Sequence, residues 1–175
     1  MNPVLLQLDR ELSSALHGLD SAQTQLRLVD DSSHWSIHQI VEHLLLTYKS
    51  TATSFQSRLA KGTPTLSRPT PRHRVGQFIV ITLGLMPGRR QAPPEVAPAN
   101  PASPLSGEQL THSATQALAD LDIIFHQAES AFGTGPCLTH FALGPLGAPQ
   151  WRRFHLSHGR HHIRQILAIR RTHGI

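Results

Sequence analysis

Histidine is the residue type that gives this chain its chemical character, with 13 histidines among 175 residues. Two of them, His158 and His162, are four positions apart in a segment whose pattern predicts one long helix. Side chains four residues apart leave a helix on the same face, one turn apart. Two imidazoles in that relation can bind one divalent metal ion. Because a helix supplies only two ligands in this way, a third must come from another part of the chain.

The helix that carries this pair has an apolar side and a basic side. At about 100° per residue, His158 and His162 share the side of Trp151 and Ile169, which we expect to face the core. Four arginines lie on the opposite side, where solvent reaches them: Arg153, Arg160, Arg164 and Arg171. The histidine pair is therefore predicted to point inward.

Two inward histidines have two interpretations. Either they are ordinary core residues with local hydrogen-bond partners, or they bind a metal ion. A buried nitrogen without a partner costs about 1–3 kcal/mol, and metal binding by neutral imidazoles removes much of that cost. Metal binding is therefore favoured, while His155 and His161, on either flank of the pair, are expected to be flanking residues.

His43 is the best candidate for the third ligand. It lies in a predicted helix between Ile40 and Leu44, on a face that also carries polar side chains. An inward face with polar residues suits a metal site that water can reach. His34 and His38 lie at the start of that helix and are expected to cap it or to lie at the surface.

Three further residues are candidates for supporting the site. Gln165 could hydrogen-bond a metal-bound water or a ligand imidazole. Trp151 could form a wall of the pocket, and His140 could line its mouth from a loop. Core packing is the alternative for Gln165 and Trp151. Glu42 projects about 100° away from His43 on the helix, so no general base is evident.

Hydrophobic spacing predicts five helices and no strand. The predicted helices cover residues 3–19, 37–59, 75–85, 107–132 and 149–172. Capping-box patterns mark two of the helix starts, at Ser36 with Gln39 and at Ser106 with Gln109. The 75–85 helix is apolar on almost every side, so we expect it to be buried.

The segments between these helices are expected to lack regular structure. Residues 63–74 indicate a linker, residues 87–104 with six prolines an ordered loop or a lid, and residues 133–147 a glycine-rich loop. The chain is therefore predicted to be all-α, an antiparallel bundle of four to five helices with a long proline-rich crossover. Its length suits a single domain over residues 1–175.

The composition restricts the location and the partners. The net charge of +5 comes almost wholly from scattered arginines without interleaved aromatic residues, which favours an ordinary basic surface over a nucleic-acid site. The single cysteine, Cys137, excludes an internal disulfide and a cysteine-rich zinc site. The first residues do not look like a signal peptide, and the most apolar run, 78–86, is too short to cross a bilayer. We expect a cytoplasmic protein without a membrane partner.

Two stretches of the chain resemble a known superfamily. The sequences are WSIHQIVEHL and LTHFALGPLGAPQWRRFHLSHGRHHIRQI. They are similar to the DinB/YfiT-like superfamily of bundle metalloproteins, in particular to an uncharacterised branch with a His-x-x-x-Gly-x-Leu, Gln-Trp and His-x-x-His-His-x-x-Gln signature. The resemblance implies a DinB-like antiparallel four-helix bundle and a three-histidine site, at positions that match His43, His158 and His162. The proline-rich segment 87–104 has no counterpart in it.

The expected function follows from an ion with three nitrogen ligands. Such an ion keeps one or more open coordination positions, and it can lower the pKa of bound water toward about 7 or polarise a substrate oxygen. Zn, Ni, Fe(II) and Mn all suit the ligands. The resemblance implies thiol-dependent transferases and isomerases, in which a low-molecular-weight thiol binds the metal as a nucleophilic thiolate. We therefore expect a metal-dependent transferase or hydrolase that acts on a small molecule.

Two other functions stay open, as does the oligomeric state. One is a non-catalytic metal- or ligand-binding module related to stress, and the other is a basic protein associated with nucleic acid. Members of the resembled superfamily are often homodimers. An apolar stripe on the last helix could serve either a dimer or the bundle, and it consists of Leu156, Ile163 and Leu167.

Overall fold

The computed structural model describes residues 1–29, 34–86, 92–100 and 103–175, and these residues are mostly helical. The α-helices are α1 (Pro3–Leu16), α2 (Ile37–Ala60), α3 (Pro71–Gln77), α4 (Gly107–Phe132) and α5 (Ala148–His173). The shorter helical segments are the 3-10 turns η1 (Gln23–Gln25) and η3 (Pro94–Val96) and the π-helical η2 (Phe78–Thr82). Two short strands, β1 (Leu138–His140) and β2 (Gly144–Leu146), form an antiparallel hairpin. The predicted helical class is confirmed, with the hairpin as an unpredicted addition.

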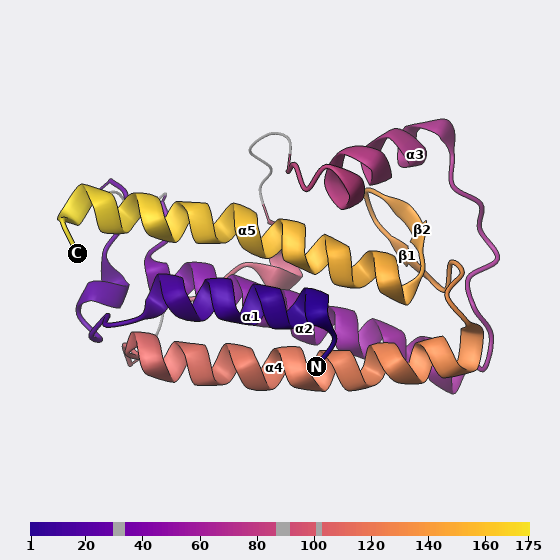
Figure 1. The fold of residues 1–175 in the computed structure, drawn as a ribbon, viewed down its shortest axis with the longest axis horizontal. Helices are drawn as coiled ribbons and strands as arrows, with labels where there is room; N and C mark the ends of the chain where they lie inside the picture. The colour runs from indigo at the N-terminus through magenta and orange to yellow at the C-terminus, as the bar shows by residue number, and fades with distance from the viewer. Residues whose placement is uncertain (30–33, 87–91, 101–102) are drawn as a thin grey trace.

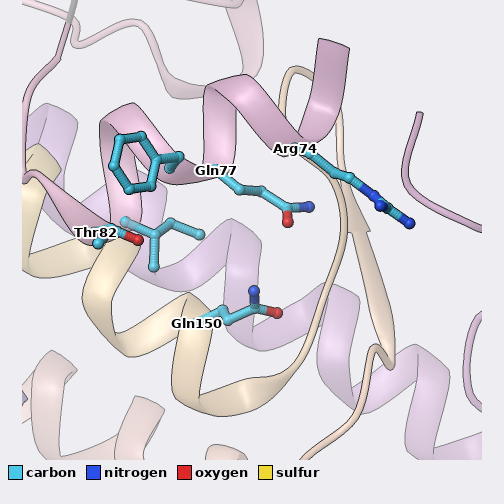
Figure 2. Close-up of a pocket in the computed structure, with 6 residues that line it drawn as sticks. Arg74, Gln77, Thr82 and Gln150 are labelled. Atoms are coloured by element: carbon cyan, nitrogen blue, oxygen red, sulfur yellow. The ribbon is translucent and has the colours of Figure 1, made fainter. Parts of the chain in front are cut away.

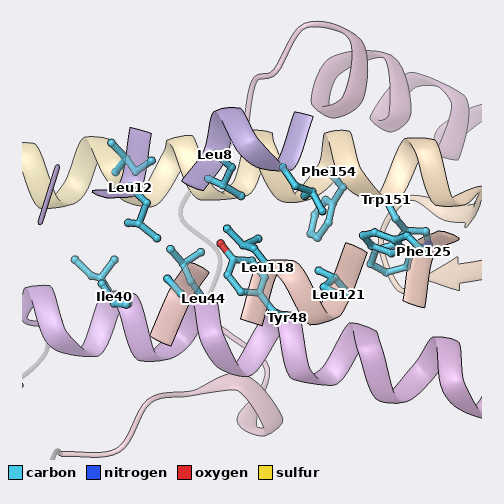
Figure 3. Packing of buried hydrophobic residues seen from close by; sticks show 14 of the residues in the cluster. Leu8, Leu12, Ile40, Leu44, Tyr48, Leu118, Leu121, Phe125, Trp151 and Phe154 are labelled. Atoms are coloured by element: carbon cyan, nitrogen blue, oxygen red, sulfur yellow. The ribbon is translucent and has the colours of Figure 1, made fainter. Parts of the chain in front are cut away.

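The four longest helices, α1, α2, α4 and α5, lie lengthwise beside one another (Figure 1). Helix α4 packs against α1 and α2, and α5 packs against α1. Their facing sides share one apolar core (Figure 3), which includes Leu8 of α1, Tyr48 of α2, Leu121 of α4 and Phe154 of α5. Burial of a large apolar side chain stabilises a fold by about 1.5–3 kcal/mol. This core therefore holds α2 and α5 in fixed positions relative to each other.

Helices α2 and α4 begin where the capping patterns predicted. The Oγ of Ser36 accepts a hydrogen bond from the N–H of Gln39, and Gln39 Oε1 accepts one from the N–H of Ser36. Ser106 and Gln109 make the same exchange at the start of α4. Each cap satisfies backbone N–H groups that the helix leaves unpaired. The cap of α2 thereby fixes the start of the helix that carries His43.

The segment predicted as a buried helix over 75–85 differs in extent and in burial. Helix α3 begins earlier, capped by Thr70, and passes directly into η2, so the predicted linker 63–74 is shorter than expected. Phe78 is 56% exposed, whereas Val80 is buried and its carbonyl accepts a hydrogen bond from Ser157 Oγ of α5 at 2.7 Å. Apolar composition alone does not say how many sides of a helix are covered. Here α3 and η2 lie at one edge of the molecule (Figure 1).

The glycine-rich segment 133–147, predicted to be a loop, contains the β1–β2 hairpin. Leu138 pairs with Leu146, whose carbonyl also accepts the N–H of the buried Cys137 at 2.9 Å. Gly144 has a φ of 70°, and a Cβ there would lie 2.3 Å from Nδ1 of His73, so the position requires glycine. With three residues in each strand, the alternation of side chains is too short to stand out in the sequence.

One arginine departs from the expected solvated basic surface. Arg152 is 2% exposed, and its guanidinium contacts Asp122 at 3.0 Å and Glu129 at 2.5 Å, both on α4. Asp122 also accepts a hydrogen bond from the N–H of Asn2 at 2.7 Å. The network therefore connects α5, α4 and the start of α1. The charged carboxylates explain how this guanidinium is buried.

The remaining predictions on architecture concern the proline-rich segment, membranes and the apolar stripe. Residues 87–91 and 101–102 lie outside the described part of the chain, while residues 92–100 contain η3, which packs against α2. Within the described ranges, no helix is both long and apolar enough to cross a membrane. Ile163 belongs to the core, Leu156 packs against it, and Leu167 is 38% exposed. The stripe thus largely serves the chain's own core, and a homodimer stays a prediction.

Candidate metal centre

Three imidazoles from two helices meet inside the molecule. His43 comes from α2, and His158 and His162 come from α5; all three are buried. Nε2 of His158 lies 3.3 Å from Nε2 of His43 and 3.1 Å from Nε2 of His162. One nitrogen from each ring falls within 4.8 Å of the other two. The structure therefore brings together the three histidines that the sequence pattern selected.

These distances suit a shared metal ion. With metal–nitrogen bonds of about 2.0–2.1 Å, two ligand nitrogens are about 3.3 Å apart at tetrahedral angles and about 3 Å apart at right angles. The two measured separations, 3.3 Å and 3.1 Å, fall in this range. Two of the three nitrogen separations thus already suit one ion, and the third is within 4.8 Å.

The hydrogen bonds on the far sides of two rings fix their tautomers. The Nδ1–H of His43 donates to the carbonyl of Val96 at 2.7 Å, and the Nδ1–H of His162 donates to Oε1 of Gln165 at 2.7 Å. In a neutral imidazole with a proton on Nδ1, Nε2 carries a lone pair. Both lone pairs face Nε2 of His158, which could donate a proton to only one of them. A cation among the three nitrogens satisfies all of them.

The third ring has an unpaired nitrogen on its other side, away from the three Nε2 atoms. Among the described residues, Nδ1 of His158 has no hydrogen-bond partner although it is fully buried. Phe154 stacks on this ring, with centroids 5.5 Å apart. An unpartnered buried nitrogen costs about 1–3 kcal/mol. As an ordinary core residue, His158 is therefore costly.

Burial keeps the three histidines neutral. It is the main cause that lowers the pKa of His162 to about 3, with the neighbouring His43 adding to the shift. The pKa values of His43 and His158 are also lowered, again mainly by burial. Neutral imidazole is the form that binds a metal ion. At ordinary pH the ligands are ready without a change of protonation.

Trp35 covers the cluster and was not selected from the sequence. Its ring lies 4.9 Å from that of His43 and 6.3 Å from that of His162, centroid to centroid. It stands immediately before Ser36, the cap of α2. That position is a signal in the sequence, because a residue before the cap packs back against the first turns of the helix.

Gln165 lies where the sequence placed it, beside a ligand imidazole. Its Oε1 accepts from His162, and its Nε2 lies 3.4 Å from Nε2 of His161, which is half-buried on the flank of the pair. An oxygen acceptor on a ligand histidine orients the ring and raises its basicity. The supporting partner of His43, the Val96 carbonyl, could not be foreseen, because a backbone group leaves no mark in the residue pattern.

Trp151 and His140 lie together on another side of Phe154. The Nε1–H of Trp151 donates to the carbonyl of Leu138 at 3.4 Å, and the ring is buried. His140 lies in β1 and not in a loop, and its ring is 4.5 Å from that of Phe154 and 5.3 Å from that of Trp151. Its Nδ1 faces two backbone N–H groups of the hairpin turn. Roles for these two residues at the pocket stay predictions.

Two histidines expected at the edge of the site or at the surface are buried instead. His155 is fully buried against the ring of Tyr48, at 5.3 Å between centroids. His38 is 6% exposed and its Nδ1 lies 3.4 Å from the N–H of Leu105. Helix α5 packs against α1, α2 and α4 together. It is therefore covered over a wider arc than its apolar stripe suggested.

Two surface hollows lie along the helices that carry the site. One of about 230 Å³ separates η2 from the start of α5, where Figure 2 shows the amides of Gln77 and Gln150 on its two sides. The other, of about 370 Å³, follows α2 beside η3. Its lining residues are Leu46, Lys49, Ser50, Thr53, Ser54 and Glu95. Leu46 is three positions after His43, and Glu95 immediately precedes Val96, but none of the three histidines lines either hollow.

Comparison with known proteins assigns most of the chain to a described family. The profile of the protein family described as Protein of unknown function (DUF1569) matches residues 6–168, a range that contains all three histidines and Gln165. No curated protein and no solved structure matches the chain.

Proposed function

We propose that this chain, which belongs to the DUF1569 family of proteins of unknown function, binds one divalent metal ion through His43, His158 and His162. The observation that carries the proposal is the convergence of three buried Nε2 atoms, 3.1 Å and 3.3 Å apart. Two of them carry lone pairs whose direction is fixed from behind by Val96 and Gln165. All three ligands are imidazole nitrogens, a donor set that Zn, Ni, Fe(II) and Mn accept.

We further infer that the protein is a metal-dependent enzyme, a transferase or hydrolase that acts on a small molecule with a low-molecular-weight thiol as a cosubstrate. An ion with three protein ligands supplies a Lewis acid with open positions for a substrate oxygen or a thiol sulfur. His43, His158 and His162 hold it in a buried setting, while Trp35 and Phe154 shield two of the rings from water. The hollow beside η3 offers Lys49 and Glu95 to the polar part of a small molecule.

The thiol part of this proposal draws on the resemblance to the DinB/YfiT-like superfamily. The arrangement of α1, α2, α4 and α5 as an antiparallel four-helix bundle of that type belongs to the same proposal. Support comes from the lengthwise packing of these helices and from the ligand positions, one on α2 and an i, i+4 pair on α5.

A non-catalytic metal- or ligand-binding module is the second candidate. The observation in its favour is that the metal-ligating group found among the described residues consists of histidines alone. A carboxylate that could act as a general base is not part of it. Both candidate functions therefore require a bound metal ion, and they differ in whether the protein catalyses a reaction.

Metal analysis of protein purified without a histidine tag tests the ion. We expect about one equivalent of a divalent metal in the wild-type protein, and loss of that metal in His43→Ala and in His158→Ala. His126→Ala is the matched control, since His126 is an exposed histidine on α4. Metal-free wild-type protein that takes up no ion on titration would refute the proposal.

Cobalt-substituted protein separates the enzyme from the binding module. For a thiol-dependent enzyme, adding a low-molecular-weight thiol should produce thiolate-to-cobalt absorption bands, and a panel of electrophiles should then be consumed. Unchanged spectra and no turnover over the whole panel would refute the proposed enzyme activity. The proposed metal binding would not be affected by that result.

A further inference from the structure

The described part of the proline-rich segment lies across α2 at the metal centre. Residues 94–100, named the strap from here on, begin with η3, which packs against α2. The carbonyl of Val96 in the strap accepts the Nδ1–H of His43 at 2.7 Å. The strap therefore contacts a proposed metal ligand directly, from the side opposite to the other two histidines.

Gln39 ties the far end of the strap to α2. Its Nε2 donates to the carbonyl of Ala99 at 3.3 Å and to Oδ1 of Asn100 at 3.1 Å. Gln39 is 6% exposed and lies four residues before His43 on the same helical face. The strap is thus held at two points one turn apart, by Gln39 and by His43.

The side chain of Gln39 has two separate tasks. Its Oε1 completes the cap of α2 by accepting the N–H of Ser36, while its Nε2 holds the strap. A capping box needs only an acceptor oxygen at this position, and glutamate serves it as well as glutamine. The amide nitrogen is therefore the part of Gln39 that the cap does not explain.

We propose that Gln39 is a positioning residue for the metal centre, acting through the strap on the tautomer of His43. This inference rests on the proposed metal binding. With the strap in place, the proton of His43 stays on Nδ1 and the Nε2 lone pair faces His158. With the strap released, His43 divides its population between two tautomers, and the fraction competent to bind falls. Apparent affinity falls with that fraction, and by linkage a bound ion holds the strap closed.

The substitution Gln39→Glu removes the strap's donor and keeps the cap. Its carboxylate would face the Ala99 carbonyl and Asn100 Oδ1, two acceptors. Because the Asn100 amide could rotate to donate to it, the decisive variant is the double substitution Gln39→Glu with Asn100→Asp. Asn100→Asp alone keeps the acceptor for Gln39 and serves as one control. Gln109→Glu is the second control, since Gln109 occupies the same capping position on α4.

Metal affinity is measured first, by titrating zinc into metal-free protein in competition with a chelator. We expect the double variant to bind zinc about 10- to 100-fold more weakly than the wild type, the range for loss of a partner that orients a ligand. Asn100→Asp and Gln109→Glu should stay near the wild-type affinity. Nitrogen NMR of the metal-free protein should show His43 protonated on Nδ1 in the wild type and a tautomer mixture in the double variant.

Native-state digestion with a glutamate-specific protease reports the strap itself. Glu95 is exposed within the strap, and the other glutamates of the chain lie within α-helices: Glu11, Glu42, Glu108 and Glu129. Cleavage after Glu95 should slow when zinc is added to the wild type. In the double variant it should be faster, and zinc should protect less.

The outcomes separate this inference from the proposed function. If the wild-type protein takes up no zinc, both the proposed metal binding and the role of Gln39 are refuted. Wild-type zinc binding together with an unchanged affinity and an unchanged His43 tautomer in the double variant overturns the role of Gln39 alone. Equal losses in Gln109→Glu would also overturn it, because they would trace the effect to helix capping.

Discussion

Nε2 of His43 lies 3.3 Å from Nε2 of His158, although 115 positions separate the two residues in the chain. Their helices bring them together through a shared apolar core, and each ring is neutral because burial lowers its pKa. Without an ion the contact is a poor one, since two lone pairs converge on one nitrogen. The consequences of that conflict can be measured.

The first prediction concerns stability with and without metal. His158→Leu should unfold at the same temperature as metal-free wild-type protein or at a higher one, because it removes a buried nitrogen that has no partner. With zinc present at about a hundred times its dissociation constant, the wild type should gain about 2.7 kcal/mol and the variant nothing. Thermal unfolding with chelator and with zinc measures both. A variant equally destabilised under both conditions would contradict the metal site.

The second prediction concerns pH. Burial lowers the pKa of His155 to about 3 and that of His140 to about 4. In an unfolded chain the pKa of histidine is about 6.5. Between the folded and the unfolded pKa values, these histidines are protonated in the unfolded chain and neutral in the folded one. Stability is therefore full above about pH 6.5 and falls as the pH drops toward about 3, by about 1.4 kcal/mol per pH unit for each such histidine.

Urea denaturation of metal-free protein at about pH 7.5 and about pH 5 measures this slope. His155→Phe should flatten it by the share of one histidine, because the ring stays aromatic and loses its titration. His17→Phe, at an exposed position, is the control for the replacement of a histidine by phenylalanine. Equal stability of the wild type at both pH values would be inconsistent with neutral buried imidazoles.

The third prediction concerns the support of His162. Gln165→Leu removes the acceptor of its Nδ1–H and should weaken zinc binding about 10- to 100-fold. Gln165→Glu keeps an acceptor oxygen and should retain most of the affinity. Gln116→Leu, which breaks a side-chain hydrogen bond on the exposed face of α4, is the control. Chelator competition gives the three zinc affinities. A wild-type affinity in Gln165→Leu would mean that Gln165 only packs beside His162 and does not support metal binding.

The fourth prediction contrasts a buried and a half-exposed arginine. Arg152→Met leaves Asp122 buried without its cation, so we expect it to cost about 3–5 kcal/mol. Arg160→Met breaks the more exposed pair with Glu11 and should cost about 0–1 kcal/mol. Chemical denaturation of both variants gives the comparison. Similar losses in the two would mean that burial does not decide the strength of these pairs.

Helical periodicity carried most of what could be predicted. Spacing places His158 and His162 on one face whatever the rest of the chain does, and the capping pattern fixes the frame in which His43 points inward. The Val96 carbonyl and the ring of Trp35 depend on how distant segments pack, and spacing holds no such information. The same limit explains Phe78, which composition made a core residue and which lies at an exposed edge.

The ligands are also unevenly distributed in the order of synthesis. His43 lies on α2, whereas His158 and His162 both lie on α5, beyond α4 and the hairpin. A chain that stops before α5 carries one ligand of the three, and an isolated α5 carries two. Retention of an ion at full affinity would therefore distinguish chains in which α5 has been made and has packed against α2 from shorter or unassembled ones.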